Sequence, residues 1–232
     1  MVKAFETWTV LPHRPLEKLT ENLWRLQGKL PGGRGTRVMT LARMRDGRVV
    51  VHNGIALEEE LMKEIEAWGT PAVIAVPNGF HRLDAKVFKQ RYPSAKVYCP
   101  AGSKRRVERV VAVDGSYEDA PRDETVRLEH VAGCPMEGVL EVRSSDGVTL
   151  VFNDLIANLP ALSGFTAIWM GPTGRPSIPR VMRWVLIKDK AACRSQLQQL
   201  GATPDLRRLI VSHGKPVLEG AGELLRSIAA TL

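Results

Sequence analysis

The sequence predicts a single-domain α/β (α+β) protein with two strand-rich halves and with helices between and after them. Residues 1–52 and 125–154 contain short apolar runs broken by turn residues, including the hairpin signals Arg45-Asp-Gly47 and Ser145-Asp-Gly147. Between and after these regions, apolar residues recur at helical spacing. The 232 residues contain no evident linker, so we expect one domain over residues 1–232.

The first half opens with strands that turns connect. We expect these strands at residues 6–10, 23–27, 37–43 and 48–52. The next apolar side chains share one helical face that ends before Gly69, which predicts a helix over residues 57–68. We then expect, in order, a buried strand, a helix that stops before a proline, a strand and a further helix, at residues 72–76, 82–92, 96–99 and 103–110.

The second half repeats the strand pattern and closes with helices. Strands are expected at residues 125–131, 138–143, 149–154 and 209–212. Residues 155–187 are rich in glycine and proline, which predicts a long structured excursion of the kind that often lines a site. Asp189 can cap a helix that runs to Leu200, and apolar residues at helical spacing predict a closing helix over residues 224–232.

Composition and charge narrow the classes of partner. Lysine and arginine exceed aspartate and glutamate by 33 to 25, a net charge of +8, but the basic clusters are short and lack interleaved aromatic residues. We therefore expect a solvated basic surface rather than a nucleic-acid interface. The chain shows neither a secretory signal nor a transmembrane stretch, so we expect a cytoplasmic protein without a membrane partner. The three separated cysteines do not suggest a disulfide framework, and the oligomeric state stays open.

Three short motifs carry the residues that are candidates for chemistry. Val151-Phe-Asn-Asp154 and Ser212-His213-Gly214 place a carboxylate and an imidazole at the ends of expected strands. Pro77-Asn78-Gly79-Phe80-His81 follows the buried strand of the first half. Carboxylate and imidazole groups bind metals and transfer protons, so Asp154 and His213 are the catalytic candidates.

These motifs, together with Leu23-Trp24 and the segment from Tyr92 to Tyr98, stand in an order that resembles the metallo-β-lactamase superfamily. More closely, the chain looks like an uncharacterised branch of it with a degenerate metal-binding motif. The resemblance covers about residues 20–230. It implies a four-layer αββα sandwich with a site at one edge, built from the loops between strands.

The resemblance also implies which ligands are kept. The family's His-x-His-x-Asp-His run falls on four residues that bind zinc poorly or not at all, namely Asn78, Phe80, Arg82 and Leu83. His81 and Asp84 are the potential ligands left near that run. The next family histidine falls on Cys134, and the bridging aspartate and closing histidine match Asp154 and His213.

Each candidate residue also has a structural interpretation. Cys134 is expected to be a small buried residue at a turn, Asp154 a cap at a strand end, and His213 a partner of a neighbouring loop or of Asp154 itself. Asn78 is expected in a turn, and His81 near the start of a helix.

We therefore hold three hypotheses. The first is a non-hydrolytic protein whose edge pocket, bordered by His81, Cys134, Asp154 and His213, binds a small, anionic ligand without a cofactor; Asn78 and His81 are its ligand-binding candidates. The second is a mononuclear metal-dependent hydrolase of esters or thioesters, with zinc held by Cys134, Asp154 and His213, or by His81 in place of Cys134. The third and weakest is association with nucleic acid through the basic surface.

Overall fold

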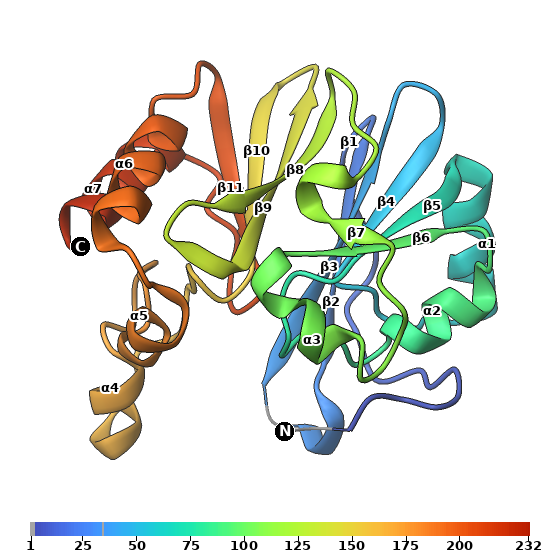
Figure 1. Ribbon diagram of the computed structural model, residues 1–232, viewed down its shortest axis with the longest axis horizontal. Coiled ribbons are helices and arrows are strands. Elements are labelled where there is room, and N and C mark those ends of the chain that lie inside the picture. The colour runs from blue at the N-terminus through green and yellow to red at the C-terminus, as the bar shows by residue number, and fades with distance from the viewer. Residues whose placement is uncertain (1–2, 34) are drawn as a thin grey trace.

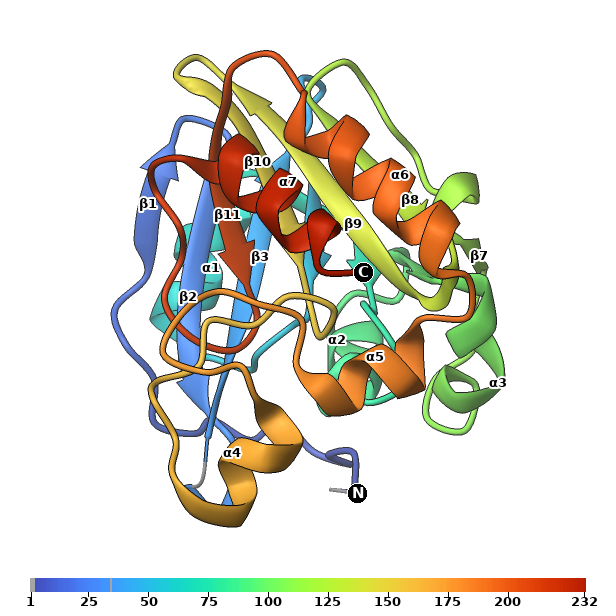
Figure 2. The same ribbon diagram turned by 90° about the vertical axis from the view of Figure 1, so that its left-hand side faces the viewer.

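Two β-sheets pack face to face, and helices cover the outer side of each sheet (Figures 1 and 2). The computed structural model describes residues 3–33 and 35–232. A first apolar core lies between the two sheets, and a second and a third lie under the helices on either side. The four-layer αββα arrangement expected from the sequence is therefore confirmed.

The larger sheet has seven strands in sequence order. Its first four strands pair antiparallel, and the later pairs, from β4 with β5 onward, are parallel. Parallel neighbours need a crossover connection, which α1 and α2 provide on the outer face. The strands are β1 (Glu17–Thr20), β2 (Leu23–Lys29), β3 (Thr36–Arg43), β4 (Arg48–His52), β5 (Thr70–Ala75), β6 (Lys96–Cys99) and β7 (Gly115–Ser116).

The smaller sheet has four strands in the order β11-β10-β9-β8. The two hairpins that join β8, β9 and β10 make antiparallel pairs, whereas β10 and β11 are parallel. A long connection separates β10 from β11, and it carries α4 to α6. The strands are β8 (Val126–Val131), β9 (Cys134–Ser144), β10 (Gly147–Phe152) and β11 (Leu206–Val211).

The helices differ in how much of their surface packs against a sheet. Met62 and Ile65 of α1 and Val87 and Phe88 of α2 enter the core under the larger sheet, while α6 and α7 cover the smaller sheet. None of the described helices is long and apolar enough to span a membrane. The helices are α1 (Glu59–Trp68), α2 (Ala85–Arg91), α3 (Lys104–Val107), α4 (Gly164–Met170), α5 (Arg180–Leu186), α6 (Lys190–Gly201) and α7 (Ala221–Ala230).

Most expected elements are present, and the differences lie mainly at the edges. The strand expected at residues 6–10 is wrong: the indole of Trp8 lies over Phe88 and donates to the Leu57 carbonyl, so this segment covers a core without joining a sheet. The short edge strands β1 and β7 were not expected. The excursion at residues 155–187 is confirmed and contains α4 and α5, and Asp189 caps α6 by accepting from the Ala192 amide.

A candidate metal centre at the strand ends

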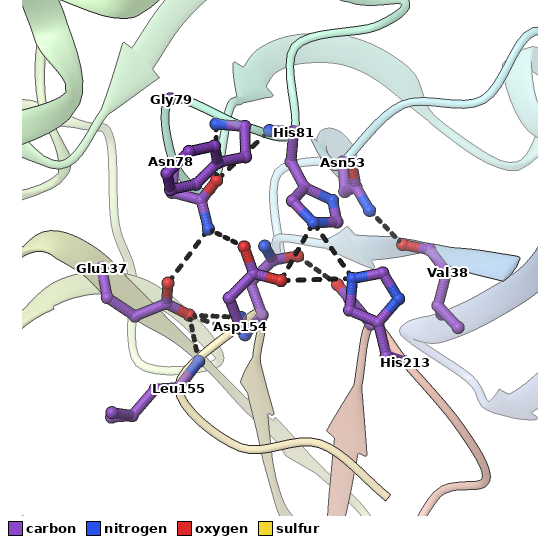
Figure 3. A network of polar contacts seen from close by, with 12 residues as sticks. Val38, Asn53, Asn78, Gly79, His81, Glu137, Asp154, Leu155 and His213 are labelled. Atoms are coloured by element: carbon purple, nitrogen blue, oxygen red, sulfur yellow. Dashed lines mark hydrogen bonds and ion pairs between the residues drawn. The ribbon is translucent and has the colours of Figure 1, made fainter. Parts of the chain in front are cut away.

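Three side chains from distant parts of the chain meet at one edge of the sandwich (Figure 3). His81 lies in the loop after β5, Asp154 follows β10, and His213 follows β11. His81 Nε2 lies 3.1 Å and His213 Nε2 lies 3.2 Å from Asp154 Oδ1, and the two nitrogens are 3.2 Å apart. The loops that continue parallel strands thus bring two imidazoles and one carboxylate oxygen to a single point.

The triangle formed by these three atoms has the size of one face of a zinc coordination tetrahedron. Donor atoms about 2.0 Å from a tetrahedral zinc ion are separated from each other by roughly 3.3 Å. The observed edges of 3.1, 3.2 and 3.2 Å come close to this separation. Among the described residues, this is the group of histidine, cysteine and acidic side chains that could hold a metal ion. Its donors also fit the preference of zinc for nitrogen and oxygen ligands.

A hydrogen bond to Nδ1, the ring nitrogen that faces away from the other two side chains, fixes the orientation of the His213 imidazole. Its Nδ1 lies 2.9 Å from the Thr36 carbonyl oxygen, which can only accept, so Nδ1 carries the proton and donates it. In neutral His213 the lone pair is then on Nε2, the atom that faces His81 and Asp154. Metal-ligating histidines commonly have such a partner on the second ring nitrogen.

The glycine after His213 is required by close packing. Gly214 has a φ of 113°, and a Cβ there would lie 1.9 Å from the Asn158 carbonyl oxygen. The Asn158 amide donates to the His213 carbonyl over 2.9 Å. The start of the long excursion is therefore fastened directly beside the imidazole.

Asn78 connects the first loop to the carboxylate. Its Nδ2 donates to Asp154 Oδ2 over 2.8 Å and to Glu137 Oε2 over 3.1 Å. Its Oδ1 accepts from the amides of Phe80 and His81, at 2.8 and 3.2 Å, which closes the turn expected here and turns His81 inward. Because Oδ2 of Asp154 is engaged by this amide, Oδ1 is the oxygen directed at the two histidines.

Glu137 holds the strand end that carries Asp154. This fully buried side chain on β9 accepts from the amides of Asn153 and Asp154, both at 2.9 Å, and of Leu155 at 3.4 Å, all at Oε1. Its other oxygen accepts from Asn78. The carboxylate therefore replaces strand pairing for three successive amides just where β10 has ended.

The electrostatics of the group follow from burial and close charges. Burial alone would raise the pKa of Asp154, but the imidazoles of His81 and His213 outweigh it and hold this pKa well below its usual range. Burial disfavours the charged form of His213, yet its bonds to Asp154 and Thr36 raise its pKa above the usual value. Burial and the nearby Asp154 carboxylate raise the pKa of Glu137 to about 8.

The three atoms need a proton or a metal ion among them, because lone pairs that face one another repel. A neutral His81 with its proton on Nε2 can donate to Asp154 Oδ1 or to His213 Nε2. A proton on His213 Nε2 removes the remaining repulsion between His213 and Asp154, and a metal ion that accepts all three lone pairs does the same. The raised pKa of His213 expresses the protonated arrangement in the absence of metal.

The structure brings together some of the predicted site residues and separates others. Asn78, His81, Asp154 and His213 lie in one network, and the expected contact between Asp154 and His213 is present. Cys134, which we expected beside them as a ligand, is not in this group. Its thiol is fully buried in the core under α6, with Sγ 3.6 Å from that of Cys193. Asp84 is also elsewhere, in a buried ion pair with Arg37.

A bulge in β9 separates Cys134 from the site. Gly138 pairs with His130 and Cys134 with Val131, so residues 135–137 have no partner in the ladder and regular alternation is interrupted between Cys134 and Gly138. Cys134 faces the outer core, whereas Glu137 faces the site. Glu137 was not among the site residues predicted from the sequence. The available signal was an acidic residue at the start of the apolar run Gly138–Leu140, a position that β9 buries.

The fold is that of the metallo-β-lactamases. The DIM-1 metallo-β-lactamase superposes with a TM-score of 0.65 at 14% identity, over 96% of this chain and 99% of that one. FIM-1 from Pseudomonas aeruginosa, in its mono-zinc form, gives 0.61 at 14% identity over 96% of both chains. A metallo-β-lactamase from Erythrobacter litoralis, with β-mercaptoethanol in its active site, gives 0.59 at 16% identity over 94% and 96%. No protein-family model and no curated protein sequence matches the chain.

Proposed function

We propose that this protein is a mononuclear, metal-dependent hydrolase whose metal ligands are His81, Asp154 and His213. The observation that carries the proposal is the triangle of 3.1 to 3.2 Å among Nε2, Oδ1 and Nε2. A zinc ion held there would supply a Lewis acid that works at neutral pH. The mono-zinc form of FIM-1, which shares the fold, supports one metal per site.

The surroundings of Asp154 favour one ion rather than two. A carboxylate that binds one ion through each oxygen would need both oxygens free, but the Asn78 amide donates to Oδ2. The same amide holds Glu137, so it cannot turn away without leaving two buried carboxylate oxygens without this donor. The degenerate first motif thus supports a site that retains one ion, with His81 serving where the family run has other histidines.

Other residues of the chain orient this group and set its access. The Thr36 carbonyl holds the tautomer of His213, Asn78 holds Asp154, and Glu137 holds the strand end. The side chains of His81 and Asp154 are 9% and 6% exposed, whereas that of His213 is 27% exposed. A substrate would therefore approach from the His213 side. Esters and thioesters are the substrate classes to test first.

The test is metal analysis of protein purified without chelator. We expect about one equivalent of zinc, or another divalent metal, in the wild type and its loss in Asp154→Ala. Cys134→Ser is the matched control, and it should keep the metal because Cys134 lies in the outer core. Hydrolysis of ester and thioester substrates should then follow the metal content. A wild type that stays metal-free after incubation with zinc contradicts the proposal.

The metal-free pocket for a small anion is the second candidate. The raised pKa of His213 supports it, because a protonated His213 satisfies Asp154 without any metal and presents a partly exposed cation. In that case Asp154→Ala should change neither metal content nor hydrolysis. Binding of inorganic phosphate to the metal-free wild type, weakened in His213→Ala, would support this candidate instead.

A further inference from the structure

An aromatic patch stands on the surface of the long excursion. It consists of Phe165, Ile168 and Trp169 on α4 and Trp184 on α5, with exposed fractions of 74, 60, 44 and 65%. The rings of Phe165 and Trp169 are 6.0 Å apart, and Trp169 meets Trp184 edge to face at 6.1 Å. The patch is therefore continuous across two helices, and two of the chain's five tryptophans lie in it.

Ordinary packing does not explain this patch. Helix α4 has apolar residues along nearly its whole length, yet none of its side chains is buried. It projects from the body of the molecule as a tip (Figures 1 and 2). Clustered large apolar side chains at the surface of a soluble fold mark an interaction site.

The charge of the segment that carries the patch indicates which kind of partner it binds. Residues 155–188 contain Arg175, Arg180, Arg183 and Lys188 and not a single aspartate or glutamate. Tryptophan and phenylalanine are favoured where an apolar layer meets water, and basic side chains are attracted to anionic headgroups. A protruding tip with aromatic and basic side chains can insert into a layer of lipid headgroups, so we favour a membrane surface over a groove in another protein.

We propose that α4 and α5 dock the protein onto a membrane surface that carries anionic lipids, with the aromatic patch inserted among the headgroups. The excursion starts immediately after Asp154 and is fastened to His213 through the Asn158 amide. Docking would thus place the membrane at the end of the molecule that carries the candidate metal centre. The proposal does not depend on metal binding. It replaces the expectation of no membrane partner, which rested on the lack of a transmembrane stretch and did not consider binding at the membrane surface.

Vesicle co-sedimentation tests the proposal. The probes are vesicles of phosphatidylcholine alone and of phosphatidylcholine with phosphatidylglycerol, at low and at high salt. We expect binding to the anionic vesicles at low salt, weakened by at least about tenfold by high salt or by omission of the anionic lipid. Binding should be the same with and without EDTA, which separates this result from the fate of the proposed function.

Matched variants locate the contact. The double variant Trp169→Ser with Trp184→Ser, and separately Phe165→Ser, should weaken binding to anionic vesicles by about tenfold or more. Leu218→Ser, which removes an apolar side chain that is 54% exposed outside the excursion, should leave binding unchanged. Circular dichroism checks that each variant is folded, and the strong exposure of the replaced side chains favours this.

Any one of the following results would overturn the proposal. The first is no binding to either vesicle, and the second is equal binding by the wild type and by folded patch variants. The third is a dimer of the wild type in lipid-free solution that the double variant abolishes, because the patch would then be covered by a second copy of the chain. Capture of an acidic protein without vesicle binding would likewise assign the patch to a protein partner.

Discussion

The two sides of the candidate metal centre are built by different means. On the smaller sheet, Asp154 and His213 lie two residues beyond the ends of β10 and β11, which run parallel with Phe152 opposite Val211. On the larger sheet, His81 lies six residues beyond the end of β5, in a loop whose shape depends on the side chain of Asn78. Sheet register brings together the two strand ends that carry the first pair of candidate ligands, and Glu137 holds the backbone after β10, whereas a single amide side chain holds the loop of the third.

This difference predicts which parts of the site tolerate substitution and which parts do not. A residue at a strand end keeps its place as long as the sheet is intact, because the ladder hydrogen bonds fix its position. A loop residue keeps its place only while its local partners remain. Substitutions can therefore separate the framework, the ligands and the loop.

Substitution of Glu137, which holds the strand end that carries Asp154, should have the largest effect, and this effect is on folding stability. Glu137→Ala removes the acceptor of three backbone amides and of the Asn78 side chain in a fully buried place. Several buried donors without a partner should lower the free energy of unfolding by about 3–5 kcal/mol. Urea denaturation measures this change. Glu124→Ala, at an exposed surface ion pair with Arg45, is the control and should change stability little.

Removal of a candidate metal ligand should have the second largest effect, which is on zinc affinity. His213→Ala and His81→Ala should each weaken zinc binding by more than roughly 100-fold, beyond the usual loss for an outer partner of a metal ligand. Titration against a competing chelator measures the affinity. Both variants should keep most of their folding stability, since the three backbone amides still bond to Glu137. Unchanged affinity in His81→Ala would exclude the first loop from the metal site.

The same contrast explains what the sequence could predict. The two strand-rich halves and the long excursion follow from the strand pattern, whereas the four-layer sandwich was what the family resemblance implied. The contact between Asp154 and His213 was expected because both residues stand at strand ends. His81 was expected as a ligand-binding residue or as a zinc ligand in place of Cys134, and the choice stayed open because no periodic pattern fixes how a loop side chain points. Cys134 stood at the aligned position, but it lies before a bulge in β9 and packs into the outer core. The position of this bulge could not be read from the sequence pattern.

Asn78 should give an intermediate effect. Asn78→Ala removes the donor to Asp154 Oδ2 and the acceptor of two loop amides, but it leaves all three ligands in the chain. As an outer partner it should weaken zinc binding by about 10–100-fold. Chelator competition again gives the affinity. An effect as large as that of His81→Ala would mean that the loop collapses without the amide, and no effect would mean that the strand ends alone orient the site.

The smallest effect we predict is a pH dependence with opposite sign in metal-free and zinc-loaded protein. Because the pKa of His213 is raised in the folded state, its pairing with Asp154 contributes full stability below the unfolded value of about 6.5. This contribution is lost as pH rises through the raised pKa. Metal-free protein should therefore melt at lower temperature at higher pH.

Zinc should reverse this trend. The metal must displace the proton from His213 Nε2, so its affinity should rise by up to about tenfold per pH unit below the raised pKa of His213. Tighter binding raises the melting temperature by mass action. Asp154 adds no slope near neutrality, because its pKa is held well below the usual range. Glu137, with its pKa raised to about 8, lowers stability as pH rises with zinc and with EDTA alike, so the difference between the two curves reports the metal. Thermal unfolding with zinc and with EDTA across this pH range measures both trends, and His213→Ala should abolish the zinc-dependent difference. Parallel curves in zinc and EDTA for the wild type would show that the proton, not a metal ion, is what the strand ends hold.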